Sequence, residues 1–497
     1  MQNNVSREVF LSTIYNYIGT IAGYIISFFT LFYLTKSLTI AQFGHCSLIL
    51  NTQTFFFLIL SFGLPSVILR YVSEYLVKHD YRTVRKIMWS SMGIIMFFGV
   101  LVSIIMAILA RKFPGTVNRF FLSQYLFLAV VLGMLRAEVR ICEAAFFAFL
   151  KQGYKIFFNV LGALLTLFLF VFSIKLGFGL LGIILSIAVV DLFLVVAYIL
   201  RIELYTRGKI SIPSKIDLNR YFTYGIKEYA TKVLSFFWDS KIDGYIITFY
   251  LGASLTGIFY FAVTAATTLA ESMPSSLMQS LSQSVFTRQY VKYENQKELA
   301  YLFSLINKLK AFFVFPVFLS FLLVIDKIVI IFFNKYTESI LIFQILLIFM
   351  IFYIFAMPLR SIVAVLERNE ILLWGSAVIL YKIPMTIFLT KNYGLIGTAF
   401  AVGTSFLLYF VVQFFLTRRV ITIVYPWKAF YKIFLNSLVV CIPILFIKPF
   451  VKDMISVLIL ILISVAVYLG ISFLHKPFDD YDRQMLNKPF KRILFNF

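Results

Sequence analysis

The sequence predicts an all-α polytopic membrane protein, and three observations lead to that fold class. Hydrophobic residues make up 61% of the chain and charged residues only 13%, with a mean hydropathy of +0.93. Soluble globular domains are nearer to half apolar and a quarter charged. Apolar runs of about 20 residues, the length of a membrane span, recur along the whole chain. Short motifs also recur between its two halves, which indicates an internal repeat.

About fourteen transmembrane helices are expected. They form two six-helix lobes, related as parallel repeats around a central cavity, followed by two extra C-terminal helices. The first apolar run is too long for a signal-peptide core, so it is expected to stay as a span. The expected helices are 10–33, 46–66, 88–110, 121–148, 156–174, 179–200, 221–250, 257–285, 305–333, 340–363, 371–390, 395–417, 430–447 and 454–474.

Three pairs of motifs at nearly one spacing support the repeat. The pairs are the turns Leu38–Gly44 and Leu251–Gly257, the dipeptides Pro65-Ser66 and Pro274-Ser275, and the helix starts Gly179–Gly182 and Gly394–Gly397, at offsets of 213, 209 and 215. Six helices is an even number, so the halves share one topology and relate by an axis along the membrane normal. The expected organisation is an N-terminal lobe (1–201), a cytoplasmic linker (202–220), a C-terminal lobe (221–419), and a segment with helices 13 and 14 and the tail (420–497).

Basic residues exceed acidic ones, and the formal net charge is +23. In a soluble protein this would suggest a nucleic-acid partner. Here lysines and arginines concentrate in alternate connections, which is typical of cytoplasmic loops. Both termini are therefore expected in the cytoplasm, and no nucleic-acid partner is expected. The three cysteines and three histidines show no ligand spacing, so neither a metal site nor a cofactor is expected.

The expected helix 221–250 carries an unusual stripe of charge. Glu228, Lys232, Asp239 and Asp243 lie at i, i+4, i+11 and i+15, within a stripe roughly 60° wide at about 100° per residue. An ionised group at the bilayer centre costs about 2.5–3.5 kcal/mol on insertion scales. This face must therefore meet a wet cavity or partner charges.

Other charges also fall inside expected helices. Arg136, Arg140 and Glu143 share one face at i, i+4 and i+7, and Asp191 lies in a later apolar run. Cations lining a polar cavity would attract anionic groups. The candidate substrate-binding residues are Arg136, Arg140, Lys232, Lys310, Arg360 and Lys382, and the candidate proton- or ion-coupling residues are Glu228, Asp239, Asp243 and Glu271.

Structural alternatives stand beside each of these roles. Arg140 with Glu143, and Glu228 with Lys232, are spaced to pair within one helix. Asp239 and Asp243 are alternatively permanent counter-ions to a cation. Two of the candidate cations, Lys310 and Arg360, and one further cation, Lys308, would alternatively reach the cytoplasmic interface with their long side chains.

Two backbone features complete the pattern. Pro65 and Pro274 fall within expected helices at matching places of the two halves, where they would act as hinges. Gly19 and Gly23, spaced as Gly-x-x-x-Gly, predict close packing of the first helix against another helix.

Five local motifs, in order, resemble one known family. They are Gln42-Phe-Gly44, the acid Asp243 near the outer end of its helix, Gly257-Ile-Phe-Tyr260, Pro274, and Tyr393-Gly-Leu-Ile-Gly-Thr-Ala399. The chain resembles the Wzx-type polysaccharide (O-antigen) flippases of the multidrug/oligosaccharidyl-lipid/polysaccharide exporter superfamily. The likeness covers the whole chain, but each motif is degenerate and none is diagnostic of substrate.

The resemblance implies a transporter rather than an enzyme. It would flip a lipid-linked (undecaprenyl diphosphate) oligosaccharide across the bacterial inner (cytoplasmic) membrane by alternating access, for O-antigen, lipopolysaccharide or capsule biosynthesis. Membrane lipids, a coupling proton or sodium ion, and the polysaccharide polymerase with its chain-length machinery are the implied partners. A cation-coupled multidrug or metabolite antiporter and a lipid II flippase of the same superfamily are the alternatives. A membrane glycosyltransferase is disfavoured, because no connection exceeds about twenty-five residues.

Overall fold

The computed structural model describes residues 2–112, 125–149, 151–209, 221, 225–226, 229, 232–233, 241–273, 296–366, 368–421 and 423–487. The described chain is all-helical and forms two compact units, Met1–Gly257 and Ile258–Phe497. Ten of the described helices are long and apolar enough to cross a membrane. The expected total of fourteen spans stays a prediction, as does the repeat-based division into lobes.

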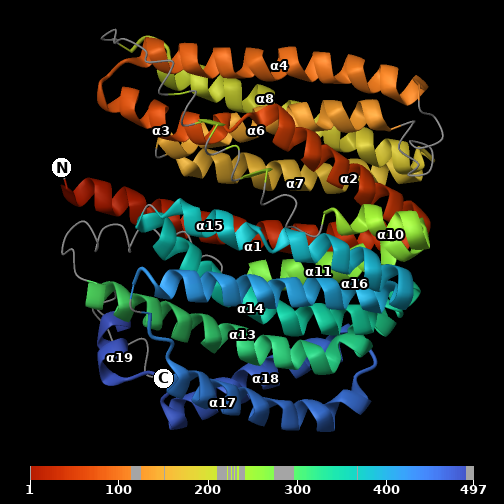
Figure 1. Cartoon of the computed structure of the whole chain (residues 1–497), viewed down its shortest axis with the longest axis vertical. Helices are drawn as coiled ribbons and strands as arrows, with labels where there is room; N and C mark the ends of the chain where they lie inside the picture. Colours follow the sequence, from red (N-terminus) through yellow and green to blue (C-terminus); the bar gives the residue numbers. More distant parts are fainter. Residues whose placement is uncertain are drawn as a thin grey trace. The chain divides into compact units, whose positions relative to one another are not determined.

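The first unit consists of long helices and two shorter ones (Figure 1). Its buried core joins α3, α4, α6 and α8, and α6 packs against α2, α3, α4 and α8. The helices are α1 (Gln2–Ser37), α2 (Ile40–Ser61), α3 (Leu64–Val77), α4 (Tyr81–Lys112), α6 (Leu126–Ala148), α7 (Gln152–Lys175), α8 (Gly179–Thr206) and α10 (Asp243–Leu251), followed by the start of α11 (Ala253–Ser272).

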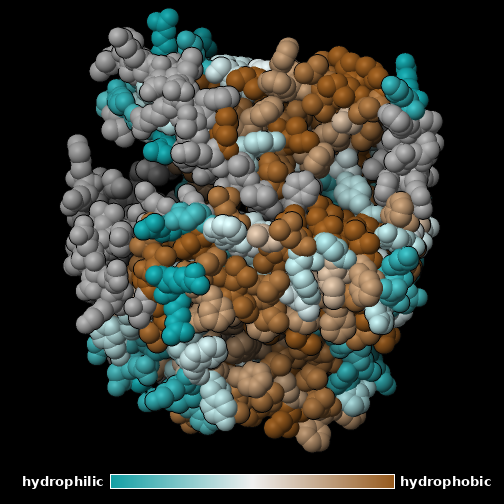
Figure 2. All heavy atoms as spheres, viewed as in Figure 1, coloured by the Kyte–Doolittle hydropathy of each residue, from teal (hydrophilic) through white to brown (hydrophobic). Residues whose placement is uncertain are grey.

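The second unit has its core between α13, α14, α17 and α18. Figure 2 shows hydrophobic residues over the middle of its helices and hydrophilic residues towards their two ends, as expected for helices that span a bilayer. The elements are α13 (Gln296–Phe332), the 3₁₀ turn η1 (Asn334–Tyr336), α14 (Ser339–Val365), α15 (Asn369–Ser376), α16 (Ile379–Arg418), α17 (Trp427–Ile447), the 3₁₀ turn η2 (Lys448–Phe450), α18 (Met454–His475) and α19 (Asp480–Asn487).

The expected helix 46–66 is broken near its end. α2 stops at Ser61, and Phe62 (φ 43°) and Gly63 (φ 73°) both adopt left-handed backbone. Pro65 then occupies the first turn of α3, where its missing N–H costs no helical hydrogen bond. Pro65 therefore starts a new helix rather than bending an old one, while Pro274 lies outside the described residues.

Matching glycines turn the chain at one place in each half. Gly179 (φ 53°) opens α8, and Gly394 (φ 61°) interrupts α16 between the expected helices 371–390 and 395–417. Only glycine adopts this backbone without steric cost, so the same residue is needed at both turns. The positive φ at both positions agrees with the repeat that the sequence motifs predict, and the repeat itself stays a prediction.

Three hydrogen bonds between side chains join α2 and α3 to the segment that follows residue 220. They occur in antiparallel order, so this segment runs back along α3 and then α2 within the first unit. The bonds are Tyr221 Oη to Tyr75 Oη (2.6 Å), Lys232 Nζ to Ser66 Oγ (2.8 Å), and Tyr245 Oη with Thr52 Oγ1 (2.6 Å).

The two repeated turns meet at the end of this antiparallel pair. A Cβ added at Gly44 would overlap the carbonyl oxygen of Ala253, and a Cβ added at Gly257 would overlap that of Ile40. Ala253 precedes Gly257 by four residues, as Ile40 precedes Gly44, so the contact is symmetric. Backbones this close recur where Cα–H groups meet carbonyl oxygens. Both glycines are therefore required by the close packing of the start of α11 on the start of α2.

A buried ion pair fixes the C-terminal helix α19 to α13. Lys308 Nζ lies 2.5 Å from Asp482 Oδ2 and 3.0 Å from Asp479 Oδ2, and Tyr301 Oη donates to Asp482 Oδ1 at 2.8 Å. The side chains of Lys308 and Asp482 are 9% and 1% exposed, whereas Asp479 is 80% exposed. The ammonium of Lys308 is therefore held by these carboxylates, and its place relative to the cytoplasmic interface stays a prediction.

We expect Gly44→Val and Gly257→Val each to destabilise the protein by about 1–3 kcal/mol, because the added side chain overlaps a backbone carbonyl. Thermal unfolding of the purified protein in detergent measures the effect. Gly93→Val in α4 is the control, since an added Cβ there meets no heavy atom within 4 Å. A Gly44→Val protein as stable as the control would contradict the symmetric contact.

We also expect Asp482→Asn to release α19, because removing one partner of a buried ion pair costs about 3 kcal/mol or more. Protease cleavage within the C-terminal segment should then become roughly 100-fold faster. Asp479→Asn is the matched control, because an exposed partner contributes no more than about 1 kcal/mol. Equal cleavage rates in the two variants would show that Asp482 does not hold the helix.

Candidate functional site

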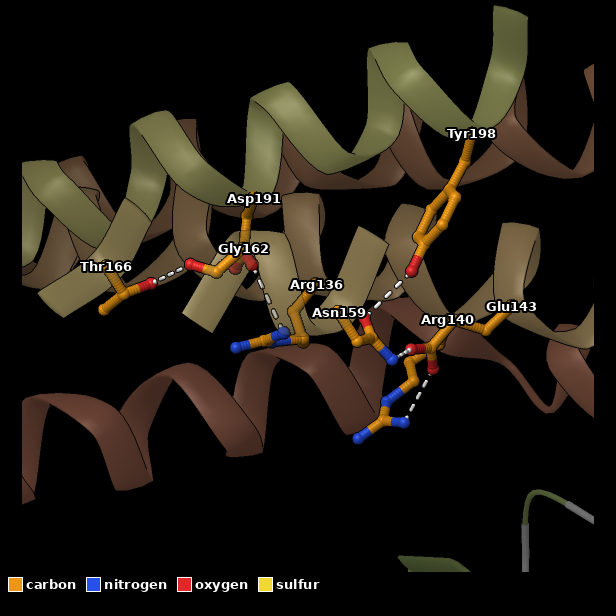
Figure 3. Close-up of polar contacts among 8 residues, drawn as sticks. All are labelled: Arg136, Arg140, Glu143, Asn159, Gly162, Thr166, Asp191 and Tyr198. Carbon is orange, nitrogen blue, oxygen red and sulfur yellow. Dashed lines mark hydrogen bonds and ion pairs between the residues drawn. The ribbon is translucent and has the colours of Figure 1, made fainter. Parts of the chain in front are cut away.

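The candidate site lies in the first unit, where charged side chains of α6 meet α7 and α8 (Figure 3). Arg136, Arg140 and Glu143 lie at i, i+4 and i+7, so they share one face of α6. The rest of that helix is largely buried and apolar. Its packing against the neighbouring helices therefore determines which groups these three side chains can reach.

Arg136 is held by an acid from α8. Its Nη1 lies 3.2 Å from Asp191 Oδ1, and the Asp191 side chain is only 2% exposed while that of Arg136 is 38% exposed. In Figure 3 Asp191 extends from α8 towards Arg136, and the arginine side chain continues away from α8. The buried carboxylate thus anchors one edge of the guanidinium and leaves its other N–H donors accessible.

Arg140 is held in the same manner through a longer chain of contacts. Its Nη1 lies 2.7 Å from Glu143 Oε2, and the two side chains are 53% and 7% exposed. Asn159 Nδ2 of α7 donates to Glu143 Oε1 at 2.8 Å, and Tyr198 Oη of α8 donates to Asn159 Oδ1 at 2.8 Å. The three helices together fix the orientation of Glu143, and Glu143 orients Arg140.

The charges of this cluster do not cancel. Arg136, Arg140 and Lys155 contribute three positive charges, and Asp191 and Glu143 contribute two negative charges. Lys155 lies close enough to Glu143 and Arg140 to interact with both electrostatically. With every group ionised, the cluster carries one excess positive charge. Preoriented guanidinium groups with free donors are suited to bind phosphate or carboxylate groups.

One further acid of α6 is not part of this cluster. Glu138 follows Arg136 by two residues, so it points to a different face of the helix. It is buried, with 6% of its surface exposed. The cluster therefore consists of the arginine face of α6 with its partners on α7 and α8.

The other sequence-predicted residues lie elsewhere. In the first unit, Lys232 donates to Ser66 Oγ, and Asp243 is a buried residue that opens α10. Glu228 and Asp239 lie outside the described residues. In the second unit, Glu271 is exposed near the end of α11, Arg360 lies on α14, and Lys382 is fully buried on α16.

Lys310 does not extend its side chain to an interface, which was the structural alternative given for it. It is only 2% exposed, and its Nζ donates to the carbonyl oxygen of Ile354 at 3.3 Å. The side chain therefore does not extend to an interface. A backbone carbonyl on α14 accepts its hydrogen bond instead.

Sequence reasoning found part of the cluster and missed the rest. The Arg140–Glu143 pair was available from spacing alone, and it is confirmed. Asp191 stood out as an acid in an apolar run, but nothing in the sequence assigned it to Arg136. Asn159 and Tyr198 were missed because they are neutral, although an amide within an apolar helix is a weak signal of a buried polar contact. Lys155, which lies in the first turn of α7, was not among the candidate cations.

The chain matches the family described as polysaccharide biosynthesis protein over residues 10–282. No curated protein sequence matches the chain significantly. Among solved structures, it is similar to the lipid II flippase MurJ in an inward closed conformation, with a TM-score of 0.69, 16% identity, and coverage of 97% of this chain and 100% of that one.

Two other solved structures are similar over less of the chain. One is an inward-facing multidrug resistance MATE family transporter of the MOP superfamily, with a TM-score of 0.60, 17% identity, and coverage of 78% of this chain and 94% of that one. The other is a MOP superfamily transporter from Pyrococcus furiosus, with a TM-score of 0.55, 15% identity, and coverage of 82% and 95%. At these identities the likeness establishes that the chain has the fold of these transporter structures.

We expect Glu143→Ala to destabilise the first unit by about 1–3 kcal/mol, because it removes the acceptor for both Arg140 and Asn159. Glu370→Ala is the control, since Glu370 pairs with Arg368 where both side chains are more than half exposed. Thermal unfolding in detergent measures both. If the two variants have the same unfolding midpoint, the buried carboxylate of Glu143 is not the anchor of this cluster.

Proposed function

Because the chain belongs to the polysaccharide biosynthesis protein family, we propose that it is a flippase for a lipid-linked oligosaccharide. The substrate is an undecaprenyl diphosphate-linked repeat unit, which the protein turns from the inner to the outer leaflet of the bacterial cytoplasmic membrane. The product enters the synthesis of a surface polysaccharide such as O-antigen or capsule. Both termini are placed in the cytoplasm in this proposal, as the distribution of basic loops favours.

The observation that carries the proposal is the arginine pair of α6. Arg136 and Arg140 lie one helical turn apart, each with one edge of its guanidinium on a buried acid and the rest accessible. A diphosphate presents several oxygens in a row, which bidentate donors recognise well. Arginine stays charged through any change of environment during transport. These properties of arginine suit the binding of a diphosphate that must leave water on one side of the membrane and re-enter it on the other.

An apolar groove in the second unit supports a substrate with a hydrocarbon chain. It has a volume of about 200 Å³ and lies between α13, α17 and α18. Its walls include Pro316, Leu460 and Tyr468, and the Tyr468 hydroxyl donates to the carbonyl oxygen of Phe312 at 2.8 Å. The wall therefore presents no unsatisfied tyrosine hydroxyl to an apolar guest. A polyprenyl carrier would lose contact with other lipids at little cost there.

The remaining candidate residues complete the proposal. Lys232, Lys310, Arg360 and Lys382 are further candidate cations for substrate binding. Glu228, Asp239, Asp243 and Glu271 are candidates for coupling to a proton or sodium ion. Polysaccharide polymerase and its chain-length machinery are the proposed protein partners. Alternating access would require the α2–α3 contacts with residues 221–257 to part during the cycle.

A lipid II flippase is the second candidate. It is favoured by one observation, the likeness to MurJ over the whole of that chain. The two candidates share a diphosphate and a polyprenyl chain and differ in the sugars. A cation-coupled multidrug antiporter is the third, supported by the MATE likeness, but its cationic substrates would not be attracted by a cluster with excess positive charge.

We expect Arg136→Gln and Arg140→Gln each to reduce export of surface glycan by roughly ten-fold or more, because each removes charge-assisted bonds to the diphosphate. A strain that lacks the gene provides the measurement. Complementation with each variant is followed by surface-glycan staining and by the amount of lipid-linked oligosaccharide left in the inner leaflet.

Lys391→Gln is the control, because Lys391 is an exposed lysine outside the cluster. Membrane levels of folded protein must be equal in all strains. Full export by both arginine variants would reject the cluster as a substrate site. Normal surface glycan in the deletion strain, with accumulation of lipid II instead, would favour the second candidate.

A further inference from the structure

The two glycines of α1 have different surroundings. A Cβ added at Gly19 would overlap the side chain of Ile156 on α7, so Gly19 permits the close contact between these helices. A Cβ added at Gly23, one turn further along, meets no heavy atom within 4 Å. The spacing predicted close packing at both positions. In the structure only Gly19 is needed for close packing. At Gly23 the missing side chain leaves an open space.

That space is a pocket between α1 and α7. Its volume is about 200 Å³, and its walls include Thr20 and Gly23 from α1 and Lys155 and Asn159 from α7. Pockets for drug-sized ligands occupy about 300–1,000 Å³, so this one accommodates a single ring or head group. α1 and α7 run in parallel here, since the next contact along them joins Tyr33 Oη to the carbonyl oxygen of Val171.

Asn159 gives the pocket an oriented amide. Its Nδ2 donates to Glu143 and its Oδ1 accepts from Tyr198, so the amide cannot turn over without losing both bonds. An amide has two N–H donors and two acceptor lone pairs. One donor and one acceptor position are therefore still available at a fixed orientation. Neighbouring hydroxyl and oxyanion groups on a small ring would match this pair.

Lys155 gives the pocket its charge. Its Nζ lies 4.4 Å from the centre of the Phe147 ring, and among the residues whose side chains are described it has no carboxylate within ion-pair distance. Glu143, the nearest acid by its electrostatic effect, already pairs with Arg140. The ammonium of Lys155 is therefore the excess positive charge of the cluster. A single negative charge would neutralise it.

We propose that this pocket binds one oxyanion, a carboxylate or a phosphate ester, carried on a ring or head group with adjacent hydroxyls. Lys155 contacts the charge, and Asn159 contacts the neighbouring polar group. The inference rests on the proposed function, because that function supplies two sources of such a group. One is an acidic sugar of the transported glycan, and the other is the head group of a membrane phospholipid.

Binding to the purified full-length protein tests the proposal. The probes are sodium glucuronate for the sugar acid, glycerol 3-phosphate for the head group, and glucose and sodium chloride as neutral and ionic controls. The thermal unfolding midpoint is followed against probe concentration. The wild-type midpoint should rise with at least one oxyanionic probe at concentrations where both controls have no effect.

Two variants remove the pocket in independent ways. Gly23→Leu fills it without meeting a neighbour at Cβ, and binding should be lost. Lys155→Gln removes the charge, and the apparent Kd should rise roughly ten-fold or more. Gly153→Leu is the matched control, because Gly153 is an exposed glycine of α7 with open space around it, and its binding curve should equal that of the wild type.

The outcomes are distinct. A response to glucuronate assigns the pocket to the glycan, and a response to glycerol 3-phosphate alone assigns it to a phospholipid. No response to either, or equal responses in the wild type and both pocket variants, would overturn the proposal. Export assays separate this from the proposed function. If Arg136→Gln loses export but the wild-type protein binds no oxyanion, only the pocket proposal is rejected. If the wild-type protein binds an oxyanion but exports no glycan, only the flippase proposal is rejected.

Discussion

The protein depends on how it accommodates ions within helices of membrane length. An ionised side chain there needs a partner or water, because the bilayer centre excludes charge. Between α6 and α8 the acids are buried and the arginines are partly exposed, so Asp191 and Glu143 act as anchors while the guanidinium groups remain accessible. In the second unit, Lys308 and Lys310 are themselves buried, and the chain supplies carboxylates to one and a carbonyl oxygen to the other. The same constraint thus gives accessible cations in one place and structural cations in the other.

The sequence predicted the features that depend on neighbouring residues. Apolar runs indicate helices, and the spacing of Arg140 and Glu143 indicates a pair within one helix, because these properties are local. Arg136 and Asp191 are different, since they meet only after α6 and α8 have packed together. Asn159 and Tyr198 carry no charge, so only the folded structure shows that they orient Glu143. The acids that hold Lys308 lie 171 and 174 positions further along the chain, so no local spacing indicates the contact.

The glycines of this chain limit sequence change for two separate reasons. At Gly179 and Gly394 the backbone itself requires glycine, because φ is positive. At Gly44 and Gly257 the backbone is helical, and the neighbouring carbonyl oxygen leaves no room for a side chain. Gly23 shows a third condition, in which neither the backbone nor a neighbour requires glycine and the small residue leaves a hollow. Sequence spacing alone does not separate these conditions, because a glycine shows neither its own φ angle nor the atoms that will pack against it.

The ion pair between α13 and α19 has a consequence for biosynthesis. Lys308 and Asp479 are separated by 171 positions along the chain, and Asp482 comes slightly later. At 5–20 residues per second, the ribosome needs on the order of 10–30 s to reach these acids after it has made Lys308. During that interval α13 enters the membrane with its lysine lacking both carboxylates. The second unit can therefore reach its final arrangement only when nearly the whole chain has been synthesised, and a ribosome that stalls within α17 or α18 leaves a buried cation without its counter-ions.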